Sequence, residues 1–113
     1  MQKLTFHCCL PAQSVYLMRH SKFGKRSHYT GATRFNPYER VKMHNTGSTR
    51  STRRVEGKWK LRAYIKFPKG TKWGEVVRVE LLAKRGPHST AGYVATLRRL
   101  SAENGCEFNE ILA

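Results

Sequence analysis

Lys58-Trp-Lys-Leu-Arg-Ala-Tyr-Ile-Lys-Phe67 is the stretch with the clearest periodicity in the chain. Apolar residues alternate with cationic or polar ones along it, and this period of two predicts a half-buried β-strand. The opposite, outer face carries four cations and one tyrosine, a composition that suits a nucleic-acid groove. The predicted inner face consists of Trp59, Leu61, Ala63, Ile65 and Phe67.

The residues after this stretch predict a second strand. Pro68-Lys-Gly-Thr-Lys72 has the composition of a turn. Trp73–Lys84 contains three valines, which are enriched in strands, and they favour a strand here over a helix capped by Thr71. The two strands together predict a β-hairpin at the start of a small folded body.

The C-terminal residues predict a helix and a final short strand. Ser89 or Thr90 can cap a helix that runs to Glu103, and Asn104-Gly105 is a typical helix stop. The alternative is a strand in this segment, paired with the preceding one. With a last strand over 106–111, the body is of the α+β class and ββαβ-like.

Residues 1–57 predict a long, extended and basic N-terminal arm before a body at 58–113. Neither the helical period of 3.6 nor the strand period of 2 persists between 19 and 57, where glycine and proline recur. The first 38 residues are basic, carry several hydroxyl groups and contain no acid. This composition predicts an uncleaved targeting segment of mitochondrial type at 1–20, the alternative being only the start of the arm.

The net charge of +15 and the pI of about 10.4 point to a polyanionic partner. Residues 1–57 carry 11 cations and two acids, and residues 58–72 carry six cations and no acid. Residues 73–113 carry five of each and are neutral overall. Nucleic acid is the first expectation and an anionic lipid surface the second. No stretch approaches the roughly 18 apolar residues of a membrane span.

Lysine and arginine side chains are the expected contacts to RNA phosphates. Three arginines in Gly47–Arg54 offer planar forks for phosphate among four hydroxyl side chains. Aromatic residues among the cations suit stacking on bases or, alternatively, pockets on neighbouring proteins. The candidate phosphate-binding residues are Arg19, Lys22, Lys25, Arg26, Arg34, Arg40, Lys42, Arg50, Arg53, Arg54, Lys58, Lys60, Arg62, Lys66 and Lys69. The candidate stacking residues are Phe23, Tyr29, Phe35 and Tyr38.

No sequence pattern predicts a metal site, a cofactor or catalysis. His7-Cys8-Cys9 lacks the second spaced pair of ligands that a structural zinc needs, and the three cysteines suggest free thiols. The seven acids, all glutamate, form no recognisable acid–base pair, and the usual nucleophile and phosphate-loop motifs are absent. The sequence therefore predicts a protein that is not an enzyme and has no small-molecule substrate.

The chain resembles organellar ribosomal proteins, which carry a small α+β body and a long basic arm that threads rRNA. Val77–Leu82 followed by Ser89–Arg99 also resembles the β-hairpin of a small large-subunit ribosomal protein family. The resemblance implies a structural constituent of a mitochondrial ribosome in the matrix, with rRNA and neighbouring ribosomal proteins as partners. The alternatives are a cytoplasmic location, a small viral or phage nucleic-acid-binding protein, and a supernumerary subunit of a respiratory membrane complex.

Overall fold

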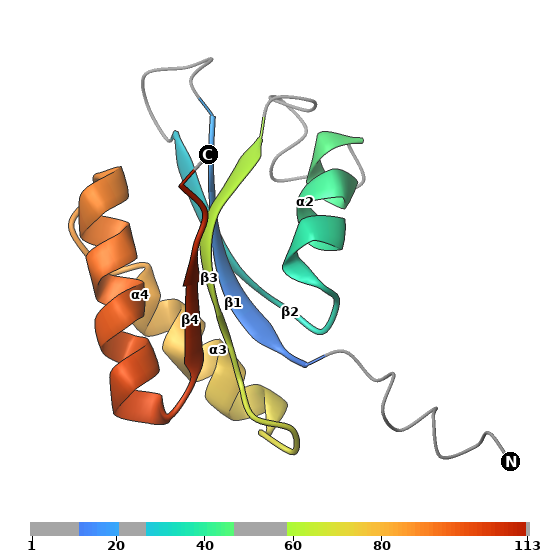
Figure 1. Ribbon diagram of the computed structural model, residues 1–113, viewed down its shortest axis with the longest axis vertical. Helices are drawn as coiled ribbons and strands as arrows, with labels where there is room; N and C mark the ends of the chain where they lie inside the picture. Colours follow the sequence, from blue (N-terminus) through green and yellow to red (C-terminus); the bar gives the residue numbers. More distant parts are fainter. Residues whose placement is uncertain (1–11, 21–26, 47–58, 113) are drawn as a thin grey trace, which may run out of the picture.

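The fold is an antiparallel four-stranded sheet with helices on both of its faces. A computed structural model describes residues 12–20, 27–46 and 59–112. The strands lie in the spatial order β2-β1-β3-β4 (Figure 1). They are β1 (Ser14–Arg19), β2 (His28–Thr33), β3 (Lys60–Lys66) and β4 (Glu107–Glu110).

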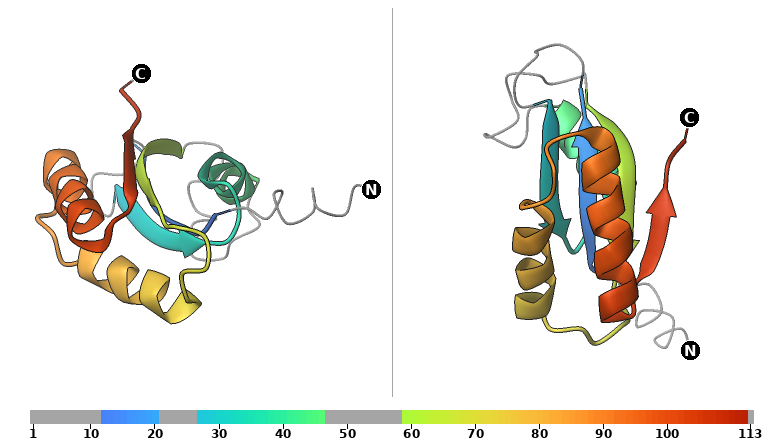
Figure 2. Two further views of the ribbon diagram at one scale, coloured as in Figure 1. Left: turned by 60° about the horizontal axis from the view of Figure 1, so that its bottom comes forward. Right: turned by 90° about the vertical axis from the view of Figure 1, so that its left-hand side faces the viewer.

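Three helices of the described residues cover the sheet unequally. Helix α2 (Pro37–Asn45) lies on one face, whereas α3 (Trp73–Ala83) and α4 (Thr90–Asn104) lie side by side on the other (Figures 1 and 2). The predicted α+β class is therefore confirmed.

Each face of the sheet has its own hydrophobic cluster, and both clusters draw on β1 and β3. The cluster under α3 and α4 contains Val15, Leu17, Ala63, Ile65, Phe67, Val76, Val79, Ala83, Val94, Leu97 and Leu100. The cluster under α2 contains Tyr16, Met18, Val41, Trp59 and Leu61. Strand β1 is thus buried on both faces and forms the centre of the molecule.

Strand β3 serves both clusters because it contains a β-bulge. Leu17 pairs with Ala63, but the next residue, Met18, pairs with Leu61, so Arg62 is an extra residue on β3. An extra residue reverses the side to which the following side chains point. The predicted alternation of buried and exposed residues is confirmed, but the single inner face is wrong.

The predicted second strand at 73–84 is wrong, because these residues form helix α3. Its buried residues are Val76, Val79 and Ala83, at helical spacings of three and four. Burial of this stripe against the sheet outweighs the preference of valine for strands. The predicted β-hairpin with β3 is consequently absent, and β3 pairs with β1 and β4 instead.

The expectation of an extended arm between 19 and 57 is wrong for His28–Thr33 and Pro37–Asn45. The first of these segments is an edge strand, and the second is a helix. Asn36 caps the helix by accepting a hydrogen bond from the backbone N–H of Tyr38 at 2.8 Å, and proline occupies its first position. The core therefore includes residues on both sides of the predicted boundary at residue 57.

Other predictions for the N-terminal half lie outside the described ranges. Residues 1–11, 21–26 and 47–58 belong to this group. The targeting segment predicted at 1–20 lies partly among them and partly in β1, and both that role and the mitochondrial location stay predictions.

The predictions for the C-terminal residues are confirmed. Ser89 caps α4 by accepting a hydrogen bond from the N–H of Gly92 at 3.0 Å. Gly105 ends the helix with a φ of 66°, the left-handed conformation that favours glycine. Strand β4 follows within the predicted segment and pairs with β3.

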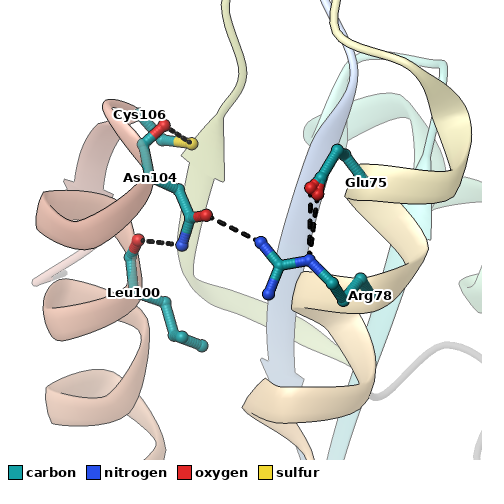
Figure 3. A network of polar contacts seen from close by, with 5 residues as sticks. All are labelled: Glu75, Arg78, Leu100, Asn104 and Cys106. Atoms are coloured by element: carbon teal, nitrogen blue, oxygen red, sulfur yellow. Dashed lines mark hydrogen bonds and ion pairs between the residues drawn. The ribbon is translucent and has the colours of Figure 1, made fainter.

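A polar network joins α3 to the C-terminal end of α4 (Figure 3). The guanidinium of Arg78 donates to Glu75 on its own helix at 2.9 Å and to Oδ1 of Asn104 at 2.9 Å. Asn104 in turn donates to the carbonyl of Leu100 at 2.9 Å. These groups are largely exposed, so the network links α3 to α4 but contributes little stability.

The two leucines Leu97 and Leu81 allow a matched test of the helix assignments. Leu97 belongs to α4 and is 1% exposed, whereas Leu81 belongs to α3 and is 53% exposed. We expect Leu97→Ala to lower the free energy of unfolding by about 2–5 kcal/mol. We expect Leu81→Ala to change it by less than about 0.5 kcal/mol. Urea denaturation followed by circular dichroism measures both, and equal losses would contradict the packing described here.

Candidate active site

Two tyrosines and a histidine form a compact cluster between the sheet and α2. Tyr16 lies on β1, Tyr29 on β2 and His44 on α2, and Tyr16 and His44 are almost completely buried. The Nε2 atom of His44 is 2.7 Å from the hydroxyl oxygen of Tyr16. The ring centroids of Tyr29 and His44 are 5.0 Å apart, and those of Tyr16 and Tyr29 are 6.3 Å apart. We call these three residues the tyrosine–histidine cluster.

Helix α2 presents Arg40 and His44 together because residues four apart share one face of a helix. The positive charge of Arg40 favours the ionised form of the Tyr16 hydroxyl and so lowers its pKa. The far end of the helix is held by Asn45, whose amide donates to the carbonyl of Trp59 at 2.9 Å and accepts from its N–H at 2.8 Å. The start of β3 therefore fixes the end of α2 that carries His44.

Gly31 leaves the space that the two tyrosine rings occupy. It pairs with Tyr16 across β1 and β2. A Cβ atom at this position would lie 2.7 Å from the Tyr16 hydroxyl oxygen and 2.9 Å from Cε1 of Tyr29. Real Cβ atoms do not approach other atoms so closely, so any larger residue would displace a ring of the cluster.

Burial is the main cause that raises the pKa of Tyr16 well above its ordinary value. The neighbouring Tyr29 and the charge of Glu80 on α3 act in the same direction, while Arg40 partly offsets them. The Tyr16 hydroxyl is therefore protonated at neutral pH. Glu80 contributes least among these causes, and it lies on α3, in the helix layer on the other face of the sheet.

Burial, assisted by the positive charge of Arg40, lowers the pKa of His44 to about 4. The imidazole is therefore neutral at pH 7. In the tautomer that carries its proton on Nδ1, Nε2 accepts the hydrogen bond from the Tyr16 hydroxyl. A neutral phenol that is hydrogen-bonded to a neutral imidazole can accept a proton at its oxygen while it donates its own proton to the imidazole nitrogen.

Sequence reasoning placed two of these residues among its candidates, but in other roles. Arg40 was expected to contact RNA phosphates and Tyr29 to stack on bases; the structure brings both to the cluster. Phe35 and Tyr38, at the start of α2, are 53% and 55% exposed, and their predicted stacking role stays a prediction.

The remaining candidate cations are spread over the chain. Arg19, Lys60 and Arg62 gather at one end of the sheet. Arg34 lies over the ring of Trp73 at 4.2 Å, while Lys42, Lys66 and Lys69 are exposed. Their phosphate contacts stay predictions. Outside the described ranges lie Lys22, Phe23, Lys25, Arg26, Arg50, Arg53, Arg54 and Lys58.

Tyr16, His44 and Glu80 were missed by the sequence reasoning. The available signal was the spacing of Arg40 and His44 by four residues after Asn36-Pro37, a typical helix start. This signal was missed because the segment was interpreted from its positive charge as part of the arm.

The family model of the GIY-YIG catalytic domain matches residues 12–85, which is more than half of the chain. A comparison with curated protein sequences found no match. The chain belongs to the GIY-YIG catalytic domain family, a class of nucleases. In place of the two tripeptides that name the family, the chain has Ser14-Val15-Tyr16 on β1 and Tyr29-Thr30-Gly31 on β2. Both tyrosines and the second glycine are kept: Tyr16 and Tyr29 belong to the tyrosine–histidine cluster, and Gly31 leaves space for their rings.

This membership corrects the expected function. The matched domain is a catalytic one that cleaves nucleic acid, so a structural ribosomal protein without enzymatic activity is wrong. The reason for the error is physical: positive charge is shared by proteins that hold nucleic acid and proteins that cut it. A nucleic-acid partner is confirmed, whereas nothing supports ribosomal proteins as partners. Among the helices of the described residues, none is long and apolar enough to cross a membrane.

Gly31 and Gly74 provide a matched test of the cluster geometry. We expect Gly31→Ala to reduce nucleic-acid cleavage by about 10²-fold, because the methyl group displaces Tyr16 or Tyr29 from its position. Gly74 lies in α3 with open space around its Cβ position, so Gly74→Ala should retain full activity. A Gly31→Ala protein with the wild-type rate would show that the packing of these rings does not matter for cleavage.

The lowered pKa of His44 predicts a loss of stability in acid. The unfolded chain takes up a proton near pH 6.5, whereas the folded protein does so near pH 4, so protonation favours unfolding as the pH falls. The contribution amounts to about 3 kcal/mol between pH 7 and pH 4, at about 1.4 kcal/mol per pKa unit. Urea denaturation across this range should show that the free energy of unfolding of His44→Gln depends less steeply on pH than that of the wild type. The variant His88→Gln, at an exposed position, should keep the pH dependence of the wild type. Identical curves for wild type and His44→Gln would contradict the buried neutral imidazole.

Proposed function

We propose that the chain is a nuclease that hydrolyses phosphodiester bonds at the tyrosine–histidine cluster. The observation that carries the proposal is the buried 2.7 Å hydrogen bond between Tyr16 and His44, inside the region that matches a catalytic domain. A fixed phenol–imidazole pair has the chemistry to remove a proton from an attacking water molecule.

The proton movements follow from the protonation states. Water attacks phosphorus, the bond from phosphorus to the leaving oxygen breaks, and that oxygen is protonated from solvent, to which His44 later returns the proton it has taken up. The Tyr16 oxygen accepts a proton from the water while its own proton passes to Nε2 of His44, so the phenolate never has to form in the resting protein. The raised pKa of Tyr16 and the lowered pKa of His44 keep both groups neutral until substrate is bound.

Arg40 links substrate binding to this proton transfer. Arg40 influences the pKa values of both Tyr16 and His44, and its guanidinium suits two-point contact with a phosphate. The positive charge of Arg40 is one of the causes that keep the His44 pKa low. An anionic phosphate beside Arg40 offsets that charge, so His44 becomes a better proton acceptor when substrate arrives.

Glu80 is the acidic residue that acts on the cluster. Its side chain is 16% exposed, and its carboxylate lies 3.2 Å from Nζ of Lys84. No group of three or more His, Cys, Asp or Glu side chains suited to a metal occurs among the described residues. Mg²⁺ is commonly bound by one or two carboxylates together with substrate phosphates and water, so a single glutamate fits it. Mg²⁺ at Glu80 would supply charge stabilisation for the phosphate.

The direct test is cleavage of labelled single- and double-stranded DNA and RNA in the presence of Mg²⁺. We expect cleavage by the wild type and a loss of at least about 10²-fold for Tyr16→Phe and for Glu80→Gln, because removing one catalytic group typically costs this much. The RNA substrates also test the RNA preference that the sequence predicts.

Glu103→Gln is the matched control for Glu80→Gln. Both glutamates lie on helices and pair with a cation four residues away, but Glu103 pairs with Arg99 on the exposed side of α4. The Glu103→Gln variant should cleave at the wild-type rate. A folded Tyr16→Phe protein with full activity, or a wild type that cleaves none of the four substrates, would refute the proposal.

A further inference from the structure

A row of basic residues crosses the sheet on the face opposite the tyrosine–histidine cluster. Arg19 on β1 pairs with His28 on β2 and with Lys60 on β3. Directly paired residues of an antiparallel sheet share a face. That face is the one covered by α4, since Nε2 of His28 is 2.7 Å from Oγ1 of Thr90 at the start of this helix.

The β-bulge adds Arg62 to this row. Its Nε atom is buried and has no hydrogen-bond partner among the residues that the structure describes. A buried N–H without a partner is costly, and a bound acceptor would remove that cost. Phosphate oxygens are the acceptors that a guanidinium pairs with best.

The start of α4 brings further positive potential to the same place. The ring of Tyr93 lies 5.1 Å from that of His28 and 5.7 Å from that of His88. The N-terminus of a helix carries a partial positive charge that favours anions. Burial, and then the charges of four basic neighbours that include Arg19 and Arg62, lower the pKa of His28. No acid contributes to that shift.

The nearest acid of β4 is already engaged elsewhere. Glu110 pairs with Ala63, next to Arg62 in the chain. Its carboxylate accepts a hydrogen bond from Arg98 of α4 at 3.2 Å. The basic row therefore keeps its charge, and Arg19 and Lys60 are exposed to solvent.

We propose that Arg19, His28, Lys60, Arg62 and His88 form a second binding surface for the phosphate backbone of nucleic acid. We call it the basic end surface. The inference rests on the proposed nuclease function in one respect, namely that the nucleic acid held here is the substrate. The surface lies on the other side of the sheet from Tyr16, so it holds phosphates away from the bond that is cut. It contributes to affinity and takes no part in the proton transfer.

The test measures the affinity of a fluorescent 30-nucleotide single strand by anisotropy at several salt concentrations. Tyr16→Phe is the background, so that binding is read without cleavage. Arg19→Gln with Lys60→Gln should weaken binding at least about fivefold. Each lost phosphate contact removes about 0.7 from the slope of log affinity against log salt, so the slope should become shallower by about 1.4. In the otherwise wild-type enzyme, this pair should raise KM and leave kcat unchanged.

Arg78→Gln with Arg99→Gln is the matched control. Both arginines are exposed on helices and paired with glutamates outside the basic end surface, so removing these two charges should change the salt slope by less than half as much. Arg62→Gln alone should make the slope of log affinity against log salt shallower by about 0.7, the change for one lost phosphate contact. Melting temperatures identify any variant that fails to fold, in which case Arg19→Gln alone, at an exposed position, decides the question.

Equal slopes for the two double variants would overturn the basic end surface. The surface would also be refuted if Arg19→Gln with Lys60→Gln spared oligonucleotide binding and instead weakened binding to phosphatidylserine vesicles. Loss of affinity without any cleavage by the wild type would support the surface and refute the nuclease. Cleavage that depends on Tyr16, together with unchanged affinity in Arg19→Gln with Lys60→Gln, would support the nuclease and refute the surface.

Discussion

The buried hydrogen bond between Tyr16 and His44 is the constraint on which the rest of the structure depends. Two buried polar rings are stable only when their polar groups are hydrogen-bonded, so β1 and α2 must keep a fixed spacing. Asn45 helps to keep this spacing because its amide makes two hydrogen bonds to the backbone of Trp59. Gly31 helps because it has no side chain to displace the tyrosine rings. The same burial that demands the bond sets both groups to the neutral state in which they can exchange a proton.

The sequence was informative where a single local rule decides the outcome. The cap at Ser89, the stop at Gly105 and the alternation along β3 each depend on a few neighbouring residues, and the structure has all of them. It was misleading at 73–84, where valine content and helical spacing disagreed and burial against the sheet decided in favour of spacing. Intrinsic preference is a weak guide when a whole helix face is buried.

The candidate site was harder to predict because its parts are far apart in the chain. Tyr16, Tyr29, His44 and Glu80 come from two strands and two helices. Only the pair on α2 leaves a local trace, and an isolated histidine or tyrosine has no periodic signature. Charge is additive and visible in any sequence, so it dominated the reasoning; it correctly indicated nucleic acid but carried no information on chemistry.

The extra residue in β3 makes one strand behave as two halves of opposite phase. On one side of Arg62 the odd-numbered residues support α2, and on the other side they support α3 and α4. Without the bulge, the same sequence would place all of its odd-numbered apolar side chains on one face, and half of them would point to the wrong layer. The packing of α2 and the packing of α3 and α4 therefore both depend on the irregularity at Arg62, which also belongs to the basic end surface.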